Sequence, residues 1–358
     1  MTRIGHYDLI TEFTTAGGGQ CRWAFASKDG HEYFLKEFLN PTYPLADSPG
    51  SAATKARKME RCIKFEQHQQ RIIAALEPLS KPGGNLVVTR DFFREGARYY
   101  KATDKIDVSS VSVDRVHTLS RRHQAILATT VAHSVQILHR IGLVHGDIKP
   151  PNVLLKETKR AHFAAKLIDF DDAFFSGEPT ARGEVVGDIV YYSPELYRYI
   201  TGDAPAADIT LASDIFALGI LFTEYFAGRR PQFGAAETCA LGALDREPLT
   251  SGVESRWPEM HYLLQQMLDV DYQKRPTIDT VIVQLKSLRD GRTIVDPIAG
   301  PAAASGSSAR DKASEATRAP ESRLRGSLVS RPETVRPCDA EKPRLRGSLI
   351  NNSRKRDD

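Results

Sequence analysis

The chain has 358 residues, of which 41% are apolar, and a net charge of +4, so it can form one large domain or two smaller ones with their own cores. It has no run of about eighteen apolar residues and no apolar leader at its start, which argues against a membrane span and a secretory signal. Its four cysteines are scattered and its ten histidines form no metal-binding pair, so we expect free thiols, no zinc site and a cytoplasmic location.

The first part of the chain alternates strand-like runs with turns. Residues 7–38 contain short apolar runs, and the "KDG" between two of them predicts a β-hairpin. Apolar residues at helical spacing, among them Cys62, Ile72 and Leu76, predict a helix over 52–76. Two further strands are expected over "NLVVTRDFF" and "RYYKATDKI". This part therefore predicts a small, strand-rich lobe.

From about residue 118 onward, helical patterns dominate. Amphipathic periodicity predicts four long helices, over 119–142, 212–228, 259–270 and 277–290. Between the first two, "NVLL" and "AAKLIDF" predict a pair of short strands. A strand-rich lobe followed by a larger helical lobe is an α+β architecture.

Beyond residue 290 the composition changes to Ala, Ser, Pro and Arg, with almost no aromatic residues. Such a segment cannot bury enough apolar surface to offset its chain entropy, so we expect residues 291–358 to form a disordered basic tail. The tail repeats "RLRGSL", which gives Ser327 and Ser348 matching contexts. The repeat is either a solvated linker or a pair of phosphorylation sites, and no fold or aromatic signal favours nucleic-acid binding.

The stretch "HGDIKPPNVLL" puts three polar side chains, Asp147, Lys149 and Asn152, into one short loop, and the next predicted strand leads to Asp169. Magnesium prefers oxygen ligands, which Asn152 and Asp169 supply. Asp147 can orient a hydroxyl and accept its proton, and Lys149 can neutralise a transferred phosphoryl group. The loop therefore predicts phosphoryl transfer from ATP with Mg²⁺ or Mn²⁺.

The loop resembles the H-R-D-x-K-x-x-N catalytic loop of protein kinases, and "DFD" at 169–171 resembles their D-F-G. Four more motifs are similar to kinase motifs and stand in the same order: "YFLKEF", "YYSPE", "SDIFALG" and "KRPT". The resemblance covers about residues 5–290 and implies a bilobal protein-kinase-like fold. It places a small β-rich lobe at about 5–106 and a larger helical lobe at about 107–290.

The resemblance also implies roles for individual residues. Lys36 would anchor the nucleotide phosphates and pair with a carboxylate of the helix over 52–76, Glu66 or else Glu60, of which Glu66 fits the spacing better. The nucleotide would also be contacted by a Gly-rich stretch, a hinge and a floor residue: Ala16, Gly17, Gly18, Gly19, Asp104, Ile106 and Leu154. Structural roles in the core and behind the catalytic loop fall to His145, Glu195, Asp214 and Arg275.

The chain departs from the family pattern at several positions. Gly146 replaces the Arg that would bind a phosphate group on the activation segment. Activation by phosphorylation of that segment through this Arg is therefore not expected. Phe34 replaces a small residue over the adenine ring, and Asp188 replaces a Thr near the catalytic loop. Asp171 replaces the Gly of D-F-G, and we expect its extra carboxylate to point to solvent rather than to bind metal.

Lys149 and the motifs after it separate two kinds of phosphotransferase. Both are similar to features of serine/threonine protein kinases that choline-kinase-like and aminoglycoside-kinase-like enzymes lack. We therefore expect a soluble, bacterial-type serine/threonine protein kinase that autophosphorylates, with protein substrates and a cognate protein phosphatase as partners. A pseudokinase that acts as a nucleotide-binding scaffold and a small-molecule kinase are the alternatives. Besides the tail serines, Ser176 and Thr180 are candidate phosphosites.

Overall fold

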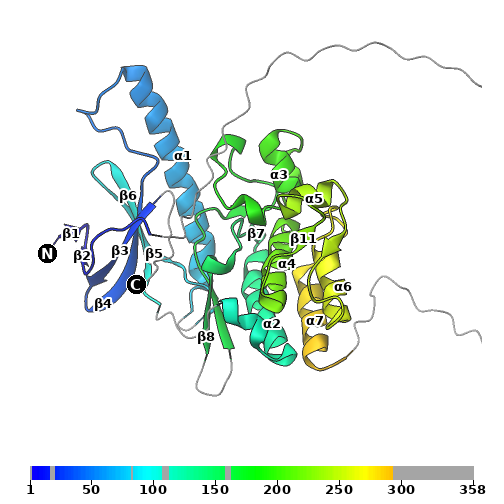
Figure 1. Ribbon diagram of the computed structural model, residues 1–358. Helices are drawn as coiled ribbons and strands as arrows, with labels where there is room; N and C mark the ends of the chain where they lie inside the picture. The colour runs from blue at the N-terminus through cyan, green and yellow to red at the C-terminus, as the bar shows by residue number, and fades with distance from the viewer. Residues whose placement is uncertain (1, 17–20, 82–83, 107–112, 158–162, 293–358) are drawn as a thin grey trace, which may run out of the picture. The chain divides into compact units, whose positions relative to one another are not determined.

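The computed structural model describes residues 2–16, 21–81, 84–106, 113–157 and 163–292, which belong to one compact unit (Figure 1). Several predictions fall outside the described residues, namely those for Gly17, Gly18, Gly19, Ser327 and Ser348. Within the described ranges, no helix is long and apolar enough to cross a membrane.

A six-stranded antiparallel sheet forms the N-terminal part, in the order β1-β2-β3-β4-β6-β5 (Figure 1, blue to cyan). Its strands are β1 Arg3–Ile4, β2 Tyr7–Leu9, β3 Cys21–Lys28, β4 His31–Phe38, β5 Thr89–Glu95 and β6 Arg98–Asp104. The predicted hairpin is confirmed, because Asp29 and Gly30 join β3 to β4 with φ angles of 52° and 77°. β2 lies in the first of the strand-like runs predicted over residues 7–38, whereas β1 has two residues and is too short for a sequence pattern to reveal it.

The register of the sheet decides which side chains face the helical part. Lys36 on β4 lies opposite Trp23 on β3 and opposite Lys101 on β6. Cross-strand partners share a face and alternate residues share it too, so Phe34 joins this set. The other face carries a core cluster of Tyr7, Ala26, Leu35, Tyr100 and Ala102.

The helix α1 Ala52–Leu76 has the bounds that the sequence predicts. The hydroxyl of Ser51 caps it by accepting a hydrogen bond from the backbone N–H of Thr54. Its buried residues are Cys62, Gln69, Ile72 and Leu76. Gln69 is the polar member of this apolar face, and the apolar pattern alone does not distinguish it from the exposed polar residues of the helix.

The second part of the unit is mostly helical. Its helices are α2 Arg121–His139, α3 Pro194–Thr201, α4 Ala212–Ala227, α5 Cys239–Leu244, α6 Pro258–Met267 and α7 Ile278–Arg289. Four of these match the predicted long helices within a few residues, whereas α3 and α5 are too short to show periodicity. An antiparallel sheet followed by a mostly helical region confirms the predicted α+β class.

Short two-stranded ladders connect the helices. They pair β8 Val153–Glu157 with β9 Phe163–Leu167, β7 Leu143–Val144 with β10 Phe174–Phe175, and β11 Gln232–Phe233 with β12 Leu249–Thr250. The first pair is the one predicted from "NVLL" and "AAKLIDF". β7 leads into the polar loop that precedes β8, and β9 leads into the polar segment that contains Asp169. The ladders therefore bring these two segments of the predicted site together.

Candidate active site

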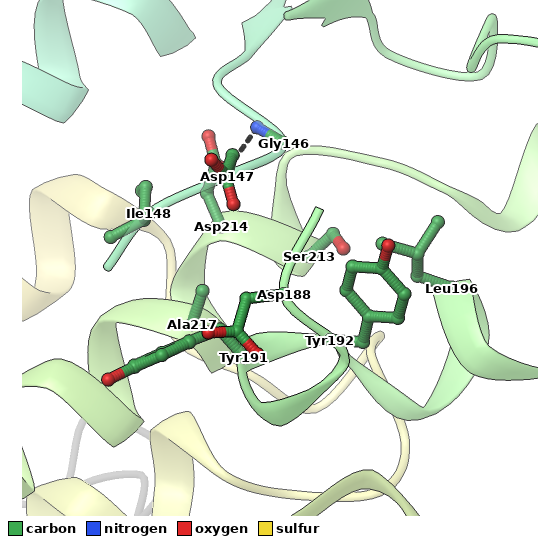
Figure 2. Close-up of a pocket in the computed structure, with 10 residues that line it drawn as sticks. All are labelled: Gly146, Asp147, Ile148, Asp188, Tyr191, Tyr192, Leu196, Ser213, Asp214 and Ala217. Atoms are coloured by element: carbon green, nitrogen blue, oxygen red, sulfur yellow. Dashed lines mark hydrogen bonds between the residues drawn. The ribbon is translucent and has the colours of Figure 1, made fainter. Parts of the chain in front are cut away.

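The loop between β7 and β8 is held from behind by one buried carboxylate. Asp214, in the first turn of α4, is 1% exposed and accepts hydrogen bonds from the backbone N–H of His145 at 2.8 Å and of Gly146 at 3.1 Å. The second of these bonds is drawn in Figure 2. Nε2 of His139, at the end of α2, lies 3.0 Å from the same carboxylate. Asp214 therefore links two helices to the loop backbone.

The backbone conformation and a close neighbour explain why residue 146 is a glycine. Its φ is +78°, in the left-handed region, and a Cβ built on it would lie 2.5 Å from the carbonyl oxygen of Asp172. Real Cβ contacts are longer than this, so a side chain here would displace the segment that contains Asp172. The sequence points only to a lost Arg at this position, whereas the structure adds a close approach of two backbones.

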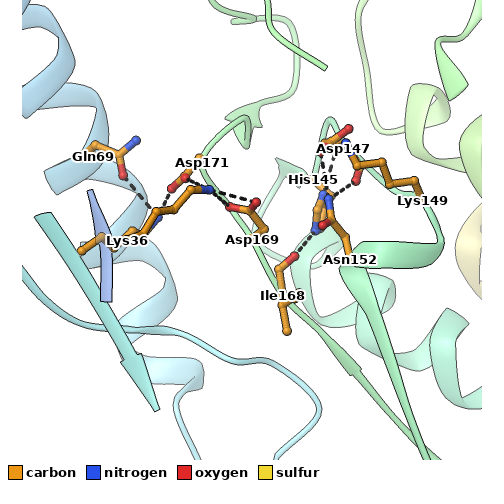
Figure 3. Close-up of polar contacts among 10 residues, drawn as sticks. Lys36, Gln69, His145, Asp147, Lys149, Asn152, Ile168, Asp169 and Asp171 are labelled. Carbon is orange, nitrogen blue, oxygen red and sulfur yellow. Dashed lines mark hydrogen bonds and ion pairs between the residues drawn. The ribbon is translucent and has the colours of Figure 1, made fainter. Parts of the chain in front are cut away.

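The three polar residues of the loop converge as the sequence predicts (Figure 3). Nζ of Lys149 lies 2.8 Å from Oδ2 of Asp147, and Nδ2 of Asn152 donates to the same oxygen at 2.8 Å. Nδ2 of Asn152 also donates to the backbone carbonyl of Asp147 at 2.8 Å. A short 3-10 turn over Pro150–Asn152 makes this possible by folding the amide back onto the aspartate. The carboxylate of Asp147 is thereby fixed in direction.

His145 lies fully buried behind the loop. Its Nε2 donates to the backbone carbonyl of Ile168 at 3.1 Å, its Nδ1 accepts from the N–H of Asp147, and its ring centroid lies 5.2 Å from that of Phe170. Both ring nitrogens are therefore occupied by the backbone. The arrangement suits a structural role for His145 and leaves it no contact with a reacting group.

Asp188 lines the same small pocket as Asp147 and Asp214 (Figure 2). Its Oδ1 accepts from the backbone N–H of Val190 at 3.1 Å and caps the short turn Ile189–Tyr191. The carboxylate thus shapes the segment that passes in front of the loop.

Asp169 follows β9 and meets Lys36, which lies 133 positions earlier in the chain. Nζ of Lys36 donates to Oδ1 at 2.9 Å and to Oδ2 at 3.0 Å (Figure 3). The backbone of Asp169 is left-handed, with φ at +63°. For a residue with a side chain, such a conformation costs about 1–3 kcal/mol and is found mainly at functional sites. The strain therefore supports a functional role for Asp169.

The expectation that Asp171 points to solvent is wrong. Its side chain is 13% exposed, and its Oδ2 lies 2.5 Å from Nζ of Lys36. Its Oδ1 forms an ion pair with Nζ of Lys101. The left-handed turn at Asp169 directs the chain back toward the sheet, where two lysines on neighbouring strands attract the carboxylate.

The expectation that Glu66 pairs with Lys36 also needs correction. The carboxylate of Glu66 accepts from the hydroxyl of Tyr99 at 2.5 Å, and Glu60 is exposed and pairs with Lys64 on its own helix. The α1 residue that approaches the lysines is the buried Gln69, whose Oε1 lies 3.4 Å from Nζ of Lys101. Its spacing of seven from Cys62, two helical turns, was the signal that could have found it.

The carboxylates here change each other's ionisation. Burial lowers the pKa of Lys36, but Asp171 and Asp169 outweigh it and raise that pKa well above its ordinary value. Burial and the neighbouring carboxylates, Asp147 first among them, raise the pKa of Asp172 to about 8. Negative charge is thus in excess at this point, which favours binding of an added cation.

The residues present fit a magnesium ion that is held partly by phosphate. Asp169 offers a carboxylate, and Asn152 offers its amide oxygen because its nitrogen is engaged by Asp147. Among the described residues, no three acidic, histidine or cysteine side chains form a closed metal site. Magnesium commonly takes one or two protein ligands and completes its shell with water and substrate phosphates, so the donor set fits.

Three aromatic rings cover the part of the sheet next to Lys36. Trp23 stacks on Phe34 with centroids 5.2 Å apart, and Phe25 contacts both rings edge-on. Nε1 of Trp23 donates to the carbonyl of Ala16 at 2.8 Å, which ties the ring to the start of the Gly-rich stretch. Phe34 is recognisable from its position in the sequence, but Trp23 is not, because its place on this face follows from the register with Lys36.

The remaining predicted nucleotide contacts lie where the two parts of the fold join. Asp104 accepts hydrogen bonds from the guanidinium of Arg90, the shortest at 2.6 Å, so its carboxylate is already occupied. Ile106 and Leu154 are half-buried. Their apolar side chains remain candidates for contacts to a base.

The two activation-segment candidates differ in exposure. Ser176 is exposed, with its backbone N–H bonded to the carbonyl of Gly142 at 2.9 Å. Thr180 is half-buried, and its carbonyl accepts from the hydroxyl of Tyr199 at 3.0 Å. Both stay predictions as phosphosites.

A buried ion pair joins α3 to the segment before α7. Both terminal nitrogens of Arg275 donate to the carboxylate of Glu195 at 2.8 Å. Arg275 also donates to the backbone carbonyls of Ala212 and Asp269, at 2.9 and 2.8 Å. The side chains of Arg275 and Glu195 are 0% and 5% exposed, so the ion pair is shielded from water and fully hydrogen-bonded.

Replacing Arg275 with Ala is expected to lower the free energy of unfolding by about 3–5 kcal/mol, because Glu195 keeps a buried charge without its partner. Urea unfolding followed by circular dichroism measures the change. The matched control is Arg289→Ala, since Arg289 pairs with Asp290 at the surface and should change stability by less than about 1 kcal/mol. Equal effects in the two variants would refute the structural role of the buried pair.

Comparison with known proteins supports one family. A model of the protein kinase domain matches residues 47–285. The serine/threonine-protein kinase PknA of Corynebacterium glutamicum is 36% identical over 120 residues, which cover 33% of this chain and 23% of that protein. The ovarian-specific serine/threonine-protein kinase Lok of Drosophila melanogaster is 33% identical over 164 residues, or 45% and 33% of the two chains.

A second bacterial relative shows the same partial coverage. The serine/threonine-protein kinase PknA of Mycobacterium tuberculosis is 29% identical over 167 residues, 46% of this chain and 35% of that protein. The matches thus span between 23% and 35% of these three relatives. The matched range 47–285 leaves out β3 and β4, so the location of Lys36 rests on the structure.

Proposed function

Because the chain belongs to the protein kinase family, we propose that it transfers the γ-phosphate of ATP to serine or threonine hydroxyls of proteins, its own chain among them. The observation that carries the proposal is the convergence of Asp147, Lys149 and Asn152 in one loop, opposite Lys36 and Asp169. The loop, Lys36 and Asp169 come from three separate parts of the sequence, and phosphoryl transfer has a distinct role for each of these residues.

Asp147 is the group that handles the proton of the acceptor. Its carboxylate is oriented by Asn152 and lies 2.8 Å from Nζ of Lys149. A substrate hydroxyl that donates to Asp147 is turned toward the phosphate and loses its proton to the carboxylate as the new P–O bond forms. Lys149 then stands beside the phosphoryl oxygens and compensates the charge that they carry.

Lys36, Asn152 and Asp169 serve the phosphate end of ATP. The ammonium of Lys36, on the face of β4 that meets Asp169, can bind the non-transferred phosphates. Asn152 and Asp169 would hold the metal, which neutralises phosphate charge when bound. The preorganised positions of these groups explain how the protein aligns acceptor and donor without covalent chemistry of its own.

The base of the nucleotide is expected to lie against the aromatic rings of Trp23 and Phe34. Replacing Phe34 with Ala should raise the KM for ATP by roughly 2- to 10-fold and leave kcat unchanged, because a stacking contact worth about 0.5–1.5 kcal/mol is lost. Steady-state kinetics with varied ATP measures this, and Phe34→Trp is the matched control that keeps an aromatic face. A lower KM in Phe34→Ala would mean that the ring obstructs the base instead.

The serine/threonine class is proposed over a small-molecule kinase. Two features support a protein substrate. Lys149 beside Asp147 resembles the protein-kinase catalytic loop. The ion pair of Glu195 with Arg275 anchors α3, which follows the segment in front of that loop. The three relatives compared above are named as serine/threonine-protein kinases, which supports the same class.

Analysis of the labelled acceptor tests this class. The purified chain and a generic protein substrate such as casein are incubated with γ-labelled ATP and Mg²⁺, and the protein is then hydrolysed in acid. Label on phosphoserine and phosphothreonine is expected. Label on phosphotyrosine, or on choline or an aminoglycoside added in parallel while protein stays unlabelled, would overturn the assignment.

A further inference from the structure

We propose that Asp171, rather than a carboxylate of α1, is the positioning residue that holds the ammonium of Lys36 in place for the nucleotide phosphates. The inference rests on the proposed function, because it concerns how Lys36 reaches ATP. It assigns the position after "DF" a task that the sequence did not suggest. Lys101 on β6 is the second cation of the arrangement.

Two lysines lie opposite each other on adjacent strands. The register pairs Lys36 on β4 with Lys101 on β6, so both side chains leave the same face of the sheet. Their side chains are only 15% and 7% exposed, so water screens them weakly. Like charges directly opposite destabilise a sheet, and an anion between them removes the penalty.

Asp171 is that anion, and it uses one oxygen for each lysine. Oδ2 of Asp171 lies 2.5 Å from Nζ of Lys36, and Oδ1 of Asp171 pairs with Nζ of Lys101. Figure 3 shows the carboxylate of Asp171 beside that of Asp169. The hydrogen-bonded ion pair with Lys101 fixes the carboxylate, and its close ionic contact with Lys36 limits where that ammonium can go. A cation held by a rigid anion on one side presents its remaining N–H groups in a fixed direction.

A second carboxylate on Lys36 is needed because Asp169 has another proposed task. Asp169 now accepts two hydrogen bonds from Lys36, yet it is also the carboxylate that would hold the metal. When it serves the metal, Lys36 keeps an anionic partner only if Asp171 stays in place. The three-residue stretch 169–171 thus contains both the metal ligand and the anchor of the lysine.

In the described part of the chain, two groups of α1 approach this arrangement, and neither is a carboxylate. They are the neutral amide of Gln69, whose Oε1 lies 3.4 Å from Nζ of Lys101, and the imidazole of His68, whose pKa is lowered by burial so that its neutral form is favoured. Glu66 is engaged by the hydroxyl of Tyr99 at 2.5 Å. It follows that the position of Lys36 depends on the segment after β9 and not on the charge of α1.

The test compares two isosteric changes. Asp171→Asn removes the bridging charge, and its kcat/KM for ATP should fall roughly 10- to 100-fold, the scale for loss of a hydrogen bond between charged groups. Glu66→Gln makes the same chemical change on α1 and should keep the wild-type kcat/KM. Asp171→Glu, which restores the carboxylate, should recover part of the loss. Equal losses in Asp171→Asn and Glu66→Gln, or no loss in Asp171→Asn, would overturn the inference.

The double variant Asp171→Asn with Lys101→Met separates positioning from simple charge balance. Removing Lys101 relieves the repulsion, so the melting temperature should rise from that of Asp171→Asn toward the wild-type value. The kcat/KM for ATP should stay low, because Lys36 still lacks its anchor. Recovery of wild-type kcat/KM in the double variant would show that Asp171 only neutralises Lys101, and would overturn the positioning role.

Failure of the proposed function gives a different result. A wild-type chain that transfers no phosphate rejects the kinase activity. The inference is then tested by measuring the affinity for ATP with isothermal titration calorimetry. Asp171→Asn should weaken binding roughly tenfold or more and Glu66→Gln should not. Equal ATP affinity in the wild type and Asp171→Asn would reject it.

Discussion

Replacing Asp147 with Asn is expected to lower kcat for phosphoryl transfer by roughly 100- to 10,000-fold, the range for loss of a general base. The amide keeps the size of the side chain and an oxygen that can accept from Asn152, so the loop should keep its shape. It cannot accept the proton of a substrate hydroxyl. Initial rates with labelled ATP and a protein substrate at saturating concentrations measure the loss.

Two controls separate chemistry from folding in this variant. The thermal midpoint should stay near that of the wild type, because Asp147 contributes to the loop and not to the apolar core. The affinity for ATP should also be retained. Loss of less than about threefold in kcat would remove Asp147 from the proton transfer that we assign to it.

Replacing Asp169 with Asn should also reduce transfer by at least about 100-fold, the scale for removing one preorganised charged group from an active site. The reason differs, because the change removes a metal-binding carboxylate. The Mg²⁺ concentration needed for half-maximal rate should therefore rise, whereas in Asp147→Asn it should not. Titration of the rate with Mg²⁺ at fixed ATP measures this requirement.

The matched control for Asp169→Asn makes the same chemical change at the surface. Asp290 lies at the end of α7 and pairs with its neighbour Arg289. Asp290→Asn should keep both the rate and the Mg²⁺ requirement. An unchanged Mg²⁺ requirement in Asp169→Asn would contradict its role as a metal ligand.

The local parts of the site were predictable because they lie close together in the sequence. Asp147, Lys149 and Asn152 fall within six residues, and no long-range packing is needed to bring them near one another. The helix α1 was predicted to its ends, because apolar residues such as Cys62, Ile72 and Leu76 recur at helical spacing along it. Its buried polar side chain was not, since periodicity locates a face but does not say which polar residue on it is buried.

The contacts of Asp171 could not be predicted because they depend on two long-range features. One is the register that puts Lys101 opposite Lys36, and a shift of one residue would turn Lys101 to the other face. The other is the left-handed backbone of Asp169, which aims the next residues at the sheet. Neither is visible in a strand pattern, so an additional acidic residue was assigned to solvent.

The expected pairing of Glu66, or else Glu60, with Lys36 illustrates the same limit, because Gln69 is the α1 residue that approaches the lysines. Glu66 and Gln69 are three residues apart, so they lie on neighbouring parts of one helix face. A carboxylate was expected beside Lys36, and Glu66 supplies one, but the hydroxyl of Tyr99 on β6 engages it. The rotation of α1 against the sheet decided the outcome, and that rotation comes from packing of the whole helix.

The central claim is that this constellation transfers phosphate and does not merely bind nucleotide. Incubation of the purified chain with γ-labelled ATP and Mg²⁺ or Mn²⁺, beside Asp147→Asn, tests it most directly. Label should accumulate on the wild-type chain or on added protein substrate and be nearly absent with the variant. Binding of ATP by the wild type without transfer under either metal would contradict the claim and identify the chain as a nucleotide-binding scaffold.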